Sequence, residues 1–224
     1  MPRKSINIGV LASGNGTNLQ AIINAVEAGR IGASIKVVIS DRPGAGALTR
    51  ARGHRIPAVA IERKGFSSKE AFDKELVRVL NDHGVELVAL AGFMRLLSGA
   101  FIKAFPMRIM NIHPALLPSF PGLGVQKAAI EHGVKFSGCT VHFVDEGCDT
   151  GPIIIQAVVP VLDGDTVEAL SERILKEEHR IYPQAIALFA DGRLRVEGRR
   201  VYVSGHPTQA GFMENPVVTV IDKY

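Results

Sequence analysis

The sequence has few of the features that mark secreted, metal-binding or membrane proteins. Its two cysteines, Cys139 and Cys148, belong to no Cys/His pattern, so we expect neither a zinc site nor a disulfide framework. It shows no signal peptide and no apolar run of membrane-spanning length. These absences predict a soluble, cytoplasmic protein that binds no metal and no membrane.

A strong excess of one charge is also missing. The 26 lysines and arginines outnumber the 22 acidic residues by only four, and no basic cluster alternates with aromatic side chains. A nucleic-acid partner is therefore not expected. The mild positive excess suits the attraction of phosphorylated small molecules.

What the sequence does have is a large apolar fraction arranged in alternating elements. Hydrophobic residues make up 46% of the 224 positions, which is enough to bury a core. Apolar runs at residues 6–12, 36–40, 57–61 and 85–91 alternate with helical patterns. This alternation predicts an α/β fold with a doubly wound, mostly parallel sheet and helices on both faces.

The pattern changes in the second half of the chain. Two apolar strands at 137–144 and 153–161, joined by a long loop, predict an antiparallel C-terminal addition to the sheet. A long helix is expected at 166–190, and Pro183 should kink or split it.

The chain shows no internal repeat and no linker. We therefore expect a single domain over residues 1–224, with an N-terminal half at about 1–105, a C-terminal half at about 106–200 and a tail at 201–224. A small hairpin should begin near residue 193.

Two polar side chains stand at the end of an expected strand. Asn111 and His113 are two positions apart, so they point to the same face of that strand, and Pro114 then ends the ladder. A hydrogen-bond donor beside an imidazole suits acid–base or oxyanion chemistry. On spacing alone, a structural histidine beside a turn asparagine explains the pair better.

Residues 13–18, Ser-Gly-Asn-Gly-Thr-Asn, form a glycine-rich turn between a strand and a helix. The glycines and the first helical amides suit a phosphate. Leu19 stands where a dinucleotide fingerprint has its third glycine, and no Gly-Lys-Ser/Thr follows, so neither that fingerprint nor a Walker motif is present. A mononucleotide phosphate cradle and a tight turn with Asn15 in the left-handed conformation are equally open.

Two further candidates lie close to expected strand ends. Arg95 follows the strand at 85–91, and ligand crevices of parallel sheets lie outside such ends. Asp149 belongs to an acidic, glycine-rich loop at 145–152 of the kind found at active sites. An aspartate that faces His113 would orient its ring and favour the protonated form.

Five strings carry a family resemblance: SGNGTNLQAI, LAGFMRLLS, NIHPALLPSFPG, GCTVHFVDEGCDTGPII and EEHRIYPQAI. Over residues 6–200 the sequence resembles the glycinamide ribonucleotide formyltransferases, folate-dependent enzymes of purine biosynthesis. The third string is shared with other folate-dependent formyltransferases and formyl hydrolases. The first and last strings together narrow the resemblance to the glycinamide ribonucleotide enzymes. It implies a formyltransferase-like fold and formyl transfer from 10-formyltetrahydrofolate, as co-substrate, to the amine of glycinamide ribonucleotide, without a metal.

The resemblance also implies roles for individual residues, with the nucleotide in the first half and folate and catalysis in the second. Asn111 and His113 would stabilise the oxyanion, and Asp149 would favour protonated His113 and help to manage the proton of the amine. The residues implied for ribonucleotide binding are Gly16, Thr17, Asn18, Leu175, Lys176, Glu177 and Glu178. Those implied for folate binding are Lys69, Met94, Arg95, Leu96, Leu97, Asn111, Asp145, Glu146, Gly147, Cys148 and Asp149. The expected partners are these small molecules alone, and the expected state is a monomer or weak homodimer.

The sequence departs from the family pattern at two places. Lys69 stands where the family often has arginine, which keeps the charge but loses the planar fork. Gly124 stands where the family commonly has histidine, so we assign no role to that short segment.

Three alternatives remain to be weighed. A 10-formyltetrahydrofolate hydrolase would carry an extra N-terminal module, for which a strand starting at Ile6 leaves no room. Methionyl-tRNA formyltransferase would need an RNA-binding domain after the catalytic half. A non-enzymatic folate or nucleotide binder would not need Asn111, His113 and Asp149 together.

Overall fold

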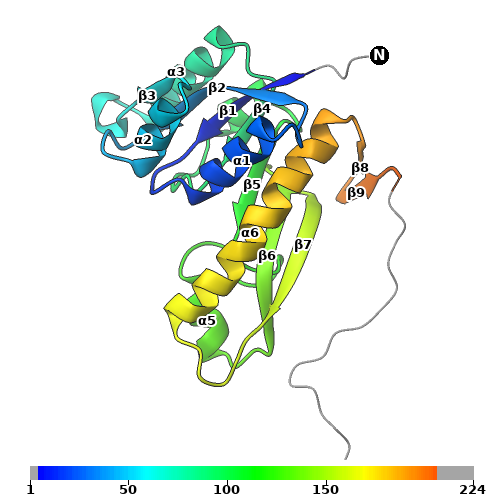
Figure 1. The fold of residues 1–224 in the computed structure, drawn as a ribbon. Helices are drawn as coiled ribbons and strands as arrows, with labels where there is room; N and C mark the ends of the chain where they lie inside the picture. The colour runs from blue at the N-terminus through cyan, green and yellow to red at the C-terminus, as the bar shows by residue number, and fades with distance from the viewer. Residues whose placement is uncertain (1–4, 206–224) are drawn as a thin grey trace, which may run out of the picture.

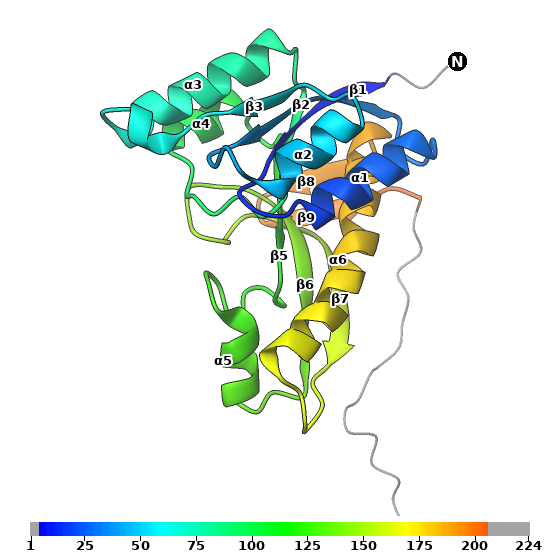
Figure 2. The same cartoon turned by 60° about the vertical axis from the view of Figure 1, so that its left-hand side comes forward.

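A computed structural model of the chain describes residues 5–205, and Figures 1 and 2 show it from two sides. The strands of this part form one sheet in the order β3-β2-β1-β4-β5-β6-β7-β9-β8. The strands are β1 (Ile6–Leu11), β2 (Ala33–Ser40), β3 (Ala58–Ala60), β4 (Leu87–Leu90), β5 (Ile109–His113), β6 (Phe136–Phe143), β7 (Ile153–Pro160), β8 (Leu194–Glu197) and β9 (Arg200–Val203). The helices are α1 (Thr17–Glu27), α2 (Gly46–Gly53), α3 (Lys69–Asp82), α4 (Gly99–Ala104), α5 (Val125–Glu131) and α6 (Val167–Ala190), with a 3₁₀ turn η1 (Arg63–Gly65).

The first five strands pair in parallel, and helices cover both of their faces. Helices α1, α2 and α6 pack on one face in a core that contains Val10. Helices α3 and α4 pack on the other face in a core that contains Leu11. Neighbouring residues of β1 thus serve opposite cores, because side chains alternate along a strand. The predicted doubly wound, mostly parallel sheet is confirmed.

The antiparallel addition is confirmed as well. Strand β5 pairs antiparallel with β6, and β6 pairs antiparallel with β7. The strands β6 and β7 extend away from the parallel part, with α5 near their far end (Figures 1 and 2). The register places His142 opposite Asn111 and Thr140 opposite His113. The two halves of the chain therefore join at the strand that carries the candidate catalytic pair.

Helix α6 runs along both halves as one continuous element (Figure 1). Pro183 lies buried inside it, so the predicted split of this helix is wrong. An interior proline costs about 3 kcal/mol, whereas burial of each large apolar side chain contributes about 1.5–3 kcal/mol. Because α6 buries Leu170, Ile174 and Ile181 among others against α1, β6 and β7, packing outweighs the lost backbone hydrogen bond.

The same helix ties down the ends of two strands. The hydroxyl of Tyr182 lies 2.9 Å from the Met110 carbonyl and 3.1 Å from the Leu90 carbonyl. Tyr182 is fully buried, and these contacts satisfy its polar group. The contact with Met110 fixes β5 at the residue before Asn111.

The predicted hairpin consists of β8 and β9, which pair antiparallel. The rest of the predicted tail, residues 206–224, lies outside the described residues. Within residues 5–205, none of the helices has the length and apolar character needed to cross a membrane.

Candidate active site

A cleft of about 630 Å³ lies at the carboxyl ends of β4 and β5. Four segments supply most of its lining: 92–97 after β4, 111–114 at the end of β5, 122–126 before and in α5, and 144–149 after β6. The segments after β4 and at the end of β5 meet here because parallel strands end at one edge of the sheet, and the register that places His142 opposite Asn111 brings the loop after β6 to the same place. The cleft thereby brings the predicted catalytic and folate-binding residues together.

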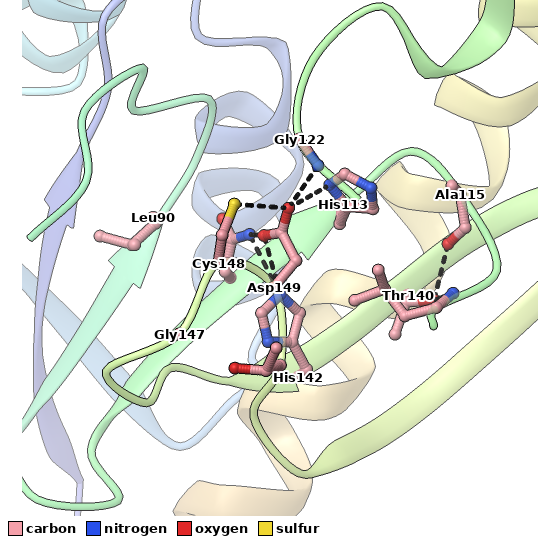
Figure 3. Close-up of polar contacts among 12 residues, drawn as sticks. Leu90, His113, Ala115, Gly122, Thr140, His142, Gly147, Cys148 and Asp149 are labelled. Carbon is pink, nitrogen blue, oxygen red and sulfur yellow. Dashed lines mark hydrogen bonds and ion pairs between the residues drawn. The ribbon is translucent and has the colours of Figure 1, made fainter. Parts of the chain in front are cut away.

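Asp149 contacts both members of the predicted pair. Figure 3 shows it beside His113, His142 and Gly122. Its Oδ2 lies 3.4 Å from His113 Nδ1, and Asn111 Nδ2 donates to its Oδ1 over 3.4 Å. The backbone N–H of Gly122 donates to Oδ2 at 2.9 Å. Asp149 adopts φ 55°, a left-handed conformation that is uncommon outside glycine and that clusters at functional sites. The predicted grouping of Asn111, His113 and Asp149 is thus present.

The buried ring of His113 has an acceptor at each nitrogen. Its Nε2 lies 2.8 Å from the carbonyl oxygen of Phe120, to which it donates, and its Nδ1 faces Asp149. A carbonyl oxygen beside one nitrogen and a carboxylate oxygen beside the other hold the ring in one orientation.

His142 is a member of this site that the sequence did not reveal. It lies on β6 with its Nε2 3.2 Å from Asn111 Nδ2 and 3.7 Å from Asp149 Oδ1. Its Nδ1 donates to the Phe143 carbonyl at 2.8 Å, which leaves Nε2 as an acceptor for the Asn111 amide. Burial lowers the pKa of His142 below its ordinary value, although the Phe143 carbonyl and the Asp149 carboxylate oppose this. His142 thus stays neutral and orients Asn111.

The glycine-rich loop enters α1 through Gly16, which has φ 74° and is the N-terminal cap residue. Of the two interpretations left open for this loop, the one with a left-handed Asn15 is wrong, because the turn places this conformation one residue later, at Gly16. Glycine is required there for two reasons. It tolerates the positive φ, and it has no Cβ, which would lie 2.7 Å from the Cα of Ala47.

The two segments that were predicted to bind the ribonucleotide meet at a buried contact. Asn18 Nδ2 donates to Glu178 Oε2 at 2.7 Å, and both side chains are buried. Burial raises the pKa of Glu178, while the Asn18 hydrogen bond and the charge of His113 act in the opposite direction. Glu178 therefore lies within electrostatic reach of the catalytic cluster, although it does not line the cleft.

The other predicted members of these segments are placed differently. Thr17 lines a separate cavity of about 340 Å³, together with Arg50 and His179. Lys176 is exposed, and Glu177 accepts hydrogen bonds from Arg180 on the outer side of α6. Of the segment 175–178, only Glu178 is brought into contact with the glycine-rich loop by a hydrogen bond.

The residues that were predicted to bind folate line the cleft. Lys69 Nζ donates to the Leu97 carbonyl at 3.2 Å, and Arg95 Nε donates to Asp41 Oδ2 at 2.5 Å. Met94 and Leu96 are 60% and 67% exposed, which leaves apolar surface at this edge. The remaining predicted folate-side residues, which form the loop after β6, are Asp145, Glu146, Gly147, Cys148 and Asp149.

The loop after β6 is held by its own side chains. Asp145 Oδ1 accepts from the Thr150 hydroxyl at 2.6 Å and from the Gly147 N–H at 3.1 Å. These bonds fix the turn that leads into Asp149. The segment 122–126 around Gly124, for which the sequence predicts no role, lines the cleft, and the Gly122 N–H in this segment donates to Asp149.

Within residues 5–205, no group of three or more His, Cys, Asp or Glu side chains is arranged to hold a metal ion. Cys139 is buried and Cys148 is exposed, and both are free thiols. Burial raises the pKa of the Cys139 thiol to about 12, which makes it an unreactive core residue.

Comparison with known proteins agrees with this geometry. The model of the formyl transferase family matches residues 6–186. The trifunctional purine biosynthetic protein adenosine-3 of Drosophila pseudoobscura pseudoobscura is 52% identical over 87% of this chain, which corresponds to 14% of that protein. The chain thus spans only a small part of such trifunctional relatives. Phosphoribosylglycinamide formyltransferase of Escherichia coli (strain K12) is 43% identical over 89% of this chain and 94% of its own length.

Solved structures give the same result. Glycinamide ribonucleotide transformylase 1 from Symbiobacterium toebii superposes with a TM-score of 0.88 at 58% identity, covering 89% of this chain and 94% of that one. A formyltetrahydrofolate deformylase from Pseudomonas syringae pv. tomato has a TM-score of 0.83 at only 26% identity, covering 89% of this chain and 66% of that one. The chain belongs to the formyl transferase family.

Proposed function

We propose that this protein transfers the formyl group of 10-formyltetrahydrofolate to the amine of glycinamide ribonucleotide in purine biosynthesis. The proposal is based on the cluster of Asn111, His113 and Asp149, which lies at the cleft of this formyl transferase family member. The full-length Escherichia coli relative bears the name of this activity, which supports the choice of substrate.

The chemistry follows from the side chains of the cluster. The amine nitrogen attacks the formyl carbon, and the carbonyl electrons move to oxygen to form a tetrahedral oxyanion. Asn111 and His113 donate hydrogen bonds to this oxygen, each contributing about 3–4 kcal/mol in the transition state. Asp149 stabilises the imidazolium of His113 and takes part in moving the proton of the amine. Collapse of the intermediate then expels the tetrahydrofolate nitrogen, which leaves with a proton.

The contacts of Asp149 leave room for this exchange of partners. Its separations of 3.4 Å from Asn111 and His113 are long for a hydrogen bond to a charged group, which is usually about 2.7–2.9 Å. The substrate oxygen can therefore take the place of Asp149 on the Asn111 amide, while His142 holds that amide from the other side. Asp149 would stay beside Nδ1 of His113, and Nε2 of His113 would turn from the Phe120 carbonyl to the substrate oxygen.

The ribonucleotide is proposed to lie between the glycine-rich loop and α6. The backbone amides of Gly16, Thr17 and Asn18 would bind its phosphate at the start of α1. Glu178 would bind its ribose or glycinamide end, with Leu175, Lys176 and Glu177 beside it. The hydrogen bond between Asn18 and Glu178 supports this arrangement because it joins the two segments.

The folate is proposed to occupy the cleft. Met94, Leu96 and Leu97 would contact its apolar part, and the loop 145–149 would close over the pterin. Lys69 and Arg95 line the same cleft and would attract the glutamate carboxylates of the folate. Lysine in place of arginine at position 69 offers charge without a planar fork.

We continue to predict a single domain over residues 1–224 and a cytoplasmic location. We also continue to predict a monomer or weak homodimer and no macromolecular partner.

One experiment separates the proposal from hydrolysis of the same folate. The absorbance of the folate product is followed with glycinamide ribonucleotide present or omitted. We expect product only when the ribonucleotide is present, because the amine is the nucleophile. Equal rates in its absence would assign the chain to 10-formyltetrahydrofolate hydrolase activity, which the Pseudomonas syringae deformylase represents among the structural neighbours.

A further inference from the structure

Helix α2 packs directly against the glycine-rich loop that precedes α1 (Figure 2). The N–H of Ala47 donates to the Gly14 carbonyl at 3.1 Å. The approach is so close that a Cβ on Gly46 would lie 3.1 Å from the Asn15 carbonyl oxygen. The loop thus packs on the first turn of α2, and its conformation depends on the contacts that α2 makes with it.

Arg50, on the second turn of α2, holds the next carbonyl of the loop. Its Nε donates to the Asn15 carbonyl oxygen at 2.8 Å, and its Nη1 donates to Gln20 Oε1 at 3.2 Å. The guanidinium is partly buried and bridges the loop to the first turn of α1. One side chain therefore connects the loop, α1 and α2.

The Gln20 amide is itself locked in the orientation that serves Arg50. Its Nε2 donates to Asn24 Oδ1 at 2.8 Å and lies 3.1 Å from His54 Nε2. His54 Nδ1 lies 2.7 Å from Glu27 Oε1, so the ring donates there and accepts from Gln20 at Nε2. Both amide hydrogens of Gln20 are thus engaged, and its oxygen is left to accept from Arg50.

The consequence for the loop follows from peptide geometry. In a trans peptide the C=O and the following N–H point in opposite directions. With the carbonyls of Gly14 and Asn15 held against α2, the amides of Asn15 and Gly16 turn to the other side of the loop. The Gly16 amide is one of those proposed to bind the phosphate.

We propose that Arg50 is a positioning residue that sets the glycine-rich loop for the phosphate of the ribonucleotide. This inference rests on the proposed function for the identity of the ligand. Arg50 acts through the Asn15 peptide, and its loss loosens the loop before any ligand is bound.

The test compares Arg50→Ala with Arg52→Ala, which removes the same charge from an exposed position on the same helix. We expect Arg50→Ala to raise the KM for glycinamide ribonucleotide about tenfold, equivalent to about 1.4 kcal/mol. The kcat and the KM for formyl folate should stay within about twofold, because the folate cleft does not include this helix. Arg52→Ala should stay within about twofold of the unaltered protein in all three values.

Arg50→Lys separates geometry from charge. Lysine keeps the positive charge but lacks the fork that reaches Asn15 and Gln20 together. We expect it to behave like Arg50→Ala. Full rescue by lysine, or equal effects of Arg50→Ala and Arg52→Ala, would overturn the positioning role.

Amide hydrogen exchange provides a readout that needs no substrate. Arg50→Ala should speed exchange at residues 14–18 while the midpoint of thermal unfolding and the exchange of β4 and β5 stay unchanged. Unchanged exchange in the loop would overturn the inference even if the KM rises. If the unaltered protein does not use glycinamide ribonucleotide, the proposed function fails, and the exchange experiment still decides whether Arg50 positions the loop.

Discussion

Asn18 donates a hydrogen bond of 2.7 Å to Glu178, which lies 160 positions later in the chain. The contact joins the start of α1 to the middle of α6 and is buried at both ends. It explains how a glycine-rich loop near the N-terminus and a helix in the second half build one candidate ribonucleotide site. It also buries a carboxylate, which has a consequence for stability.

Glu178→Gln should stabilise the fold near neutral pH and weaken ribonucleotide binding. Burial raises the pKa of Glu178 above its ordinary value, so the folded protein holds this proton to a higher pH than the unfolded chain does. Protonated Glu178 therefore contributes to the stability of the folded state. This contribution is complete below the ordinary pKa of glutamate and is lost as the pH rises through the pKa that Glu178 has in the folded protein. Denaturant unfolding should therefore show a gain of the variant over the unaltered protein at neutral pH that shrinks near pH 4.

Glutamine still accepts from Asn18 but carries no charge, so the KM for the ribonucleotide should rise about tenfold. Glu172→Gln, at an exposed position of the same helix, is the matched control and should show no such pH dependence. A gain in stability that is equal at both pH values would contradict the account of Glu178.

His113→Ala and Asp149→Ala should each remove most formyl transfer while the fold stays intact. Loss of one oxyanion donor typically costs about 10²–10³ in kcat. Asp149→Asn is the sharper variant, because asparagine tolerates the positive φ and can still accept from Gly122. Turnover measured alongside circular dichroism checks this, with Asp163→Asn at a 96% exposed position as the control. Near-normal turnover by either His113 or Asp149 variants would remove them from the mechanism.

The sequence was sufficient where local periodicity decides the geometry. Asn111 and His113 share a face because a strand has a period of two, and both indeed reach Asp149. It failed where the answer depends on tertiary packing. The left-handed residue of the loop is Gly16 and not Asn15, because Ala47 from α2 fills the space that a side chain would need.

His142 is another feature of the site that local sequence did not predict. The alternating pattern of residues 137–144 predicts a covered strand, but not which residue stands opposite Asn111. That depends on the register between β5 and β6, which the sequence of either strand alone does not specify. Pro183 was expected to kink or split α6, and the packing of the helix across both halves of the chain prevents the split.

His142→Gln should lower kcat and change how steeply the free energy of unfolding decreases at acidic pH. Glutamine offers an amide oxygen to Asn111 but on a different stem, so we expect about a tenfold loss of kcat. Burial lowers the pKa of His142, so the unfolded chain takes up its proton at a higher pH than the folded protein does. The unaltered protein therefore loses stability as the pH falls below the ordinary histidine pKa of about 6.5 toward the lower folded pKa, and the variant should lose less stability in unfolding measurements. Equal losses in both proteins would show that this ring does not contribute.

Arg95→Ala should raise the KM for formyl folate without changing that for the ribonucleotide. Arg95 lines the cleft, and two neighbours orient its guanidinium: the buried Asp41 carboxylate at 2.5 Å and the Phe72 ring, whose centroid lies 5.8 Å away. Arginine pairs with carboxylates through two parallel hydrogen bonds, so its loss should raise this KM about tenfold. A formyl folate that lacks the glutamate tail should show a much smaller change, because the proposed contact of Arg95 is with the tail.

Asp41 offers a matched pair of variants for the same contact. Asp41→Asn keeps an oxygen that accepts from Arg95 Nε, whereas Asp41→Ala removes it. If Asp41 aims Arg95 at the folate, Asp41→Ala should raise the KM for formyl folate severalfold and Asp41→Asn should raise it less. Steady-state kinetics with both substrates varied checks this. An increase that appears in the ribonucleotide KM instead would place Arg95 at the other substrate, because a contact made by one ligand changes the affinity for that ligand first.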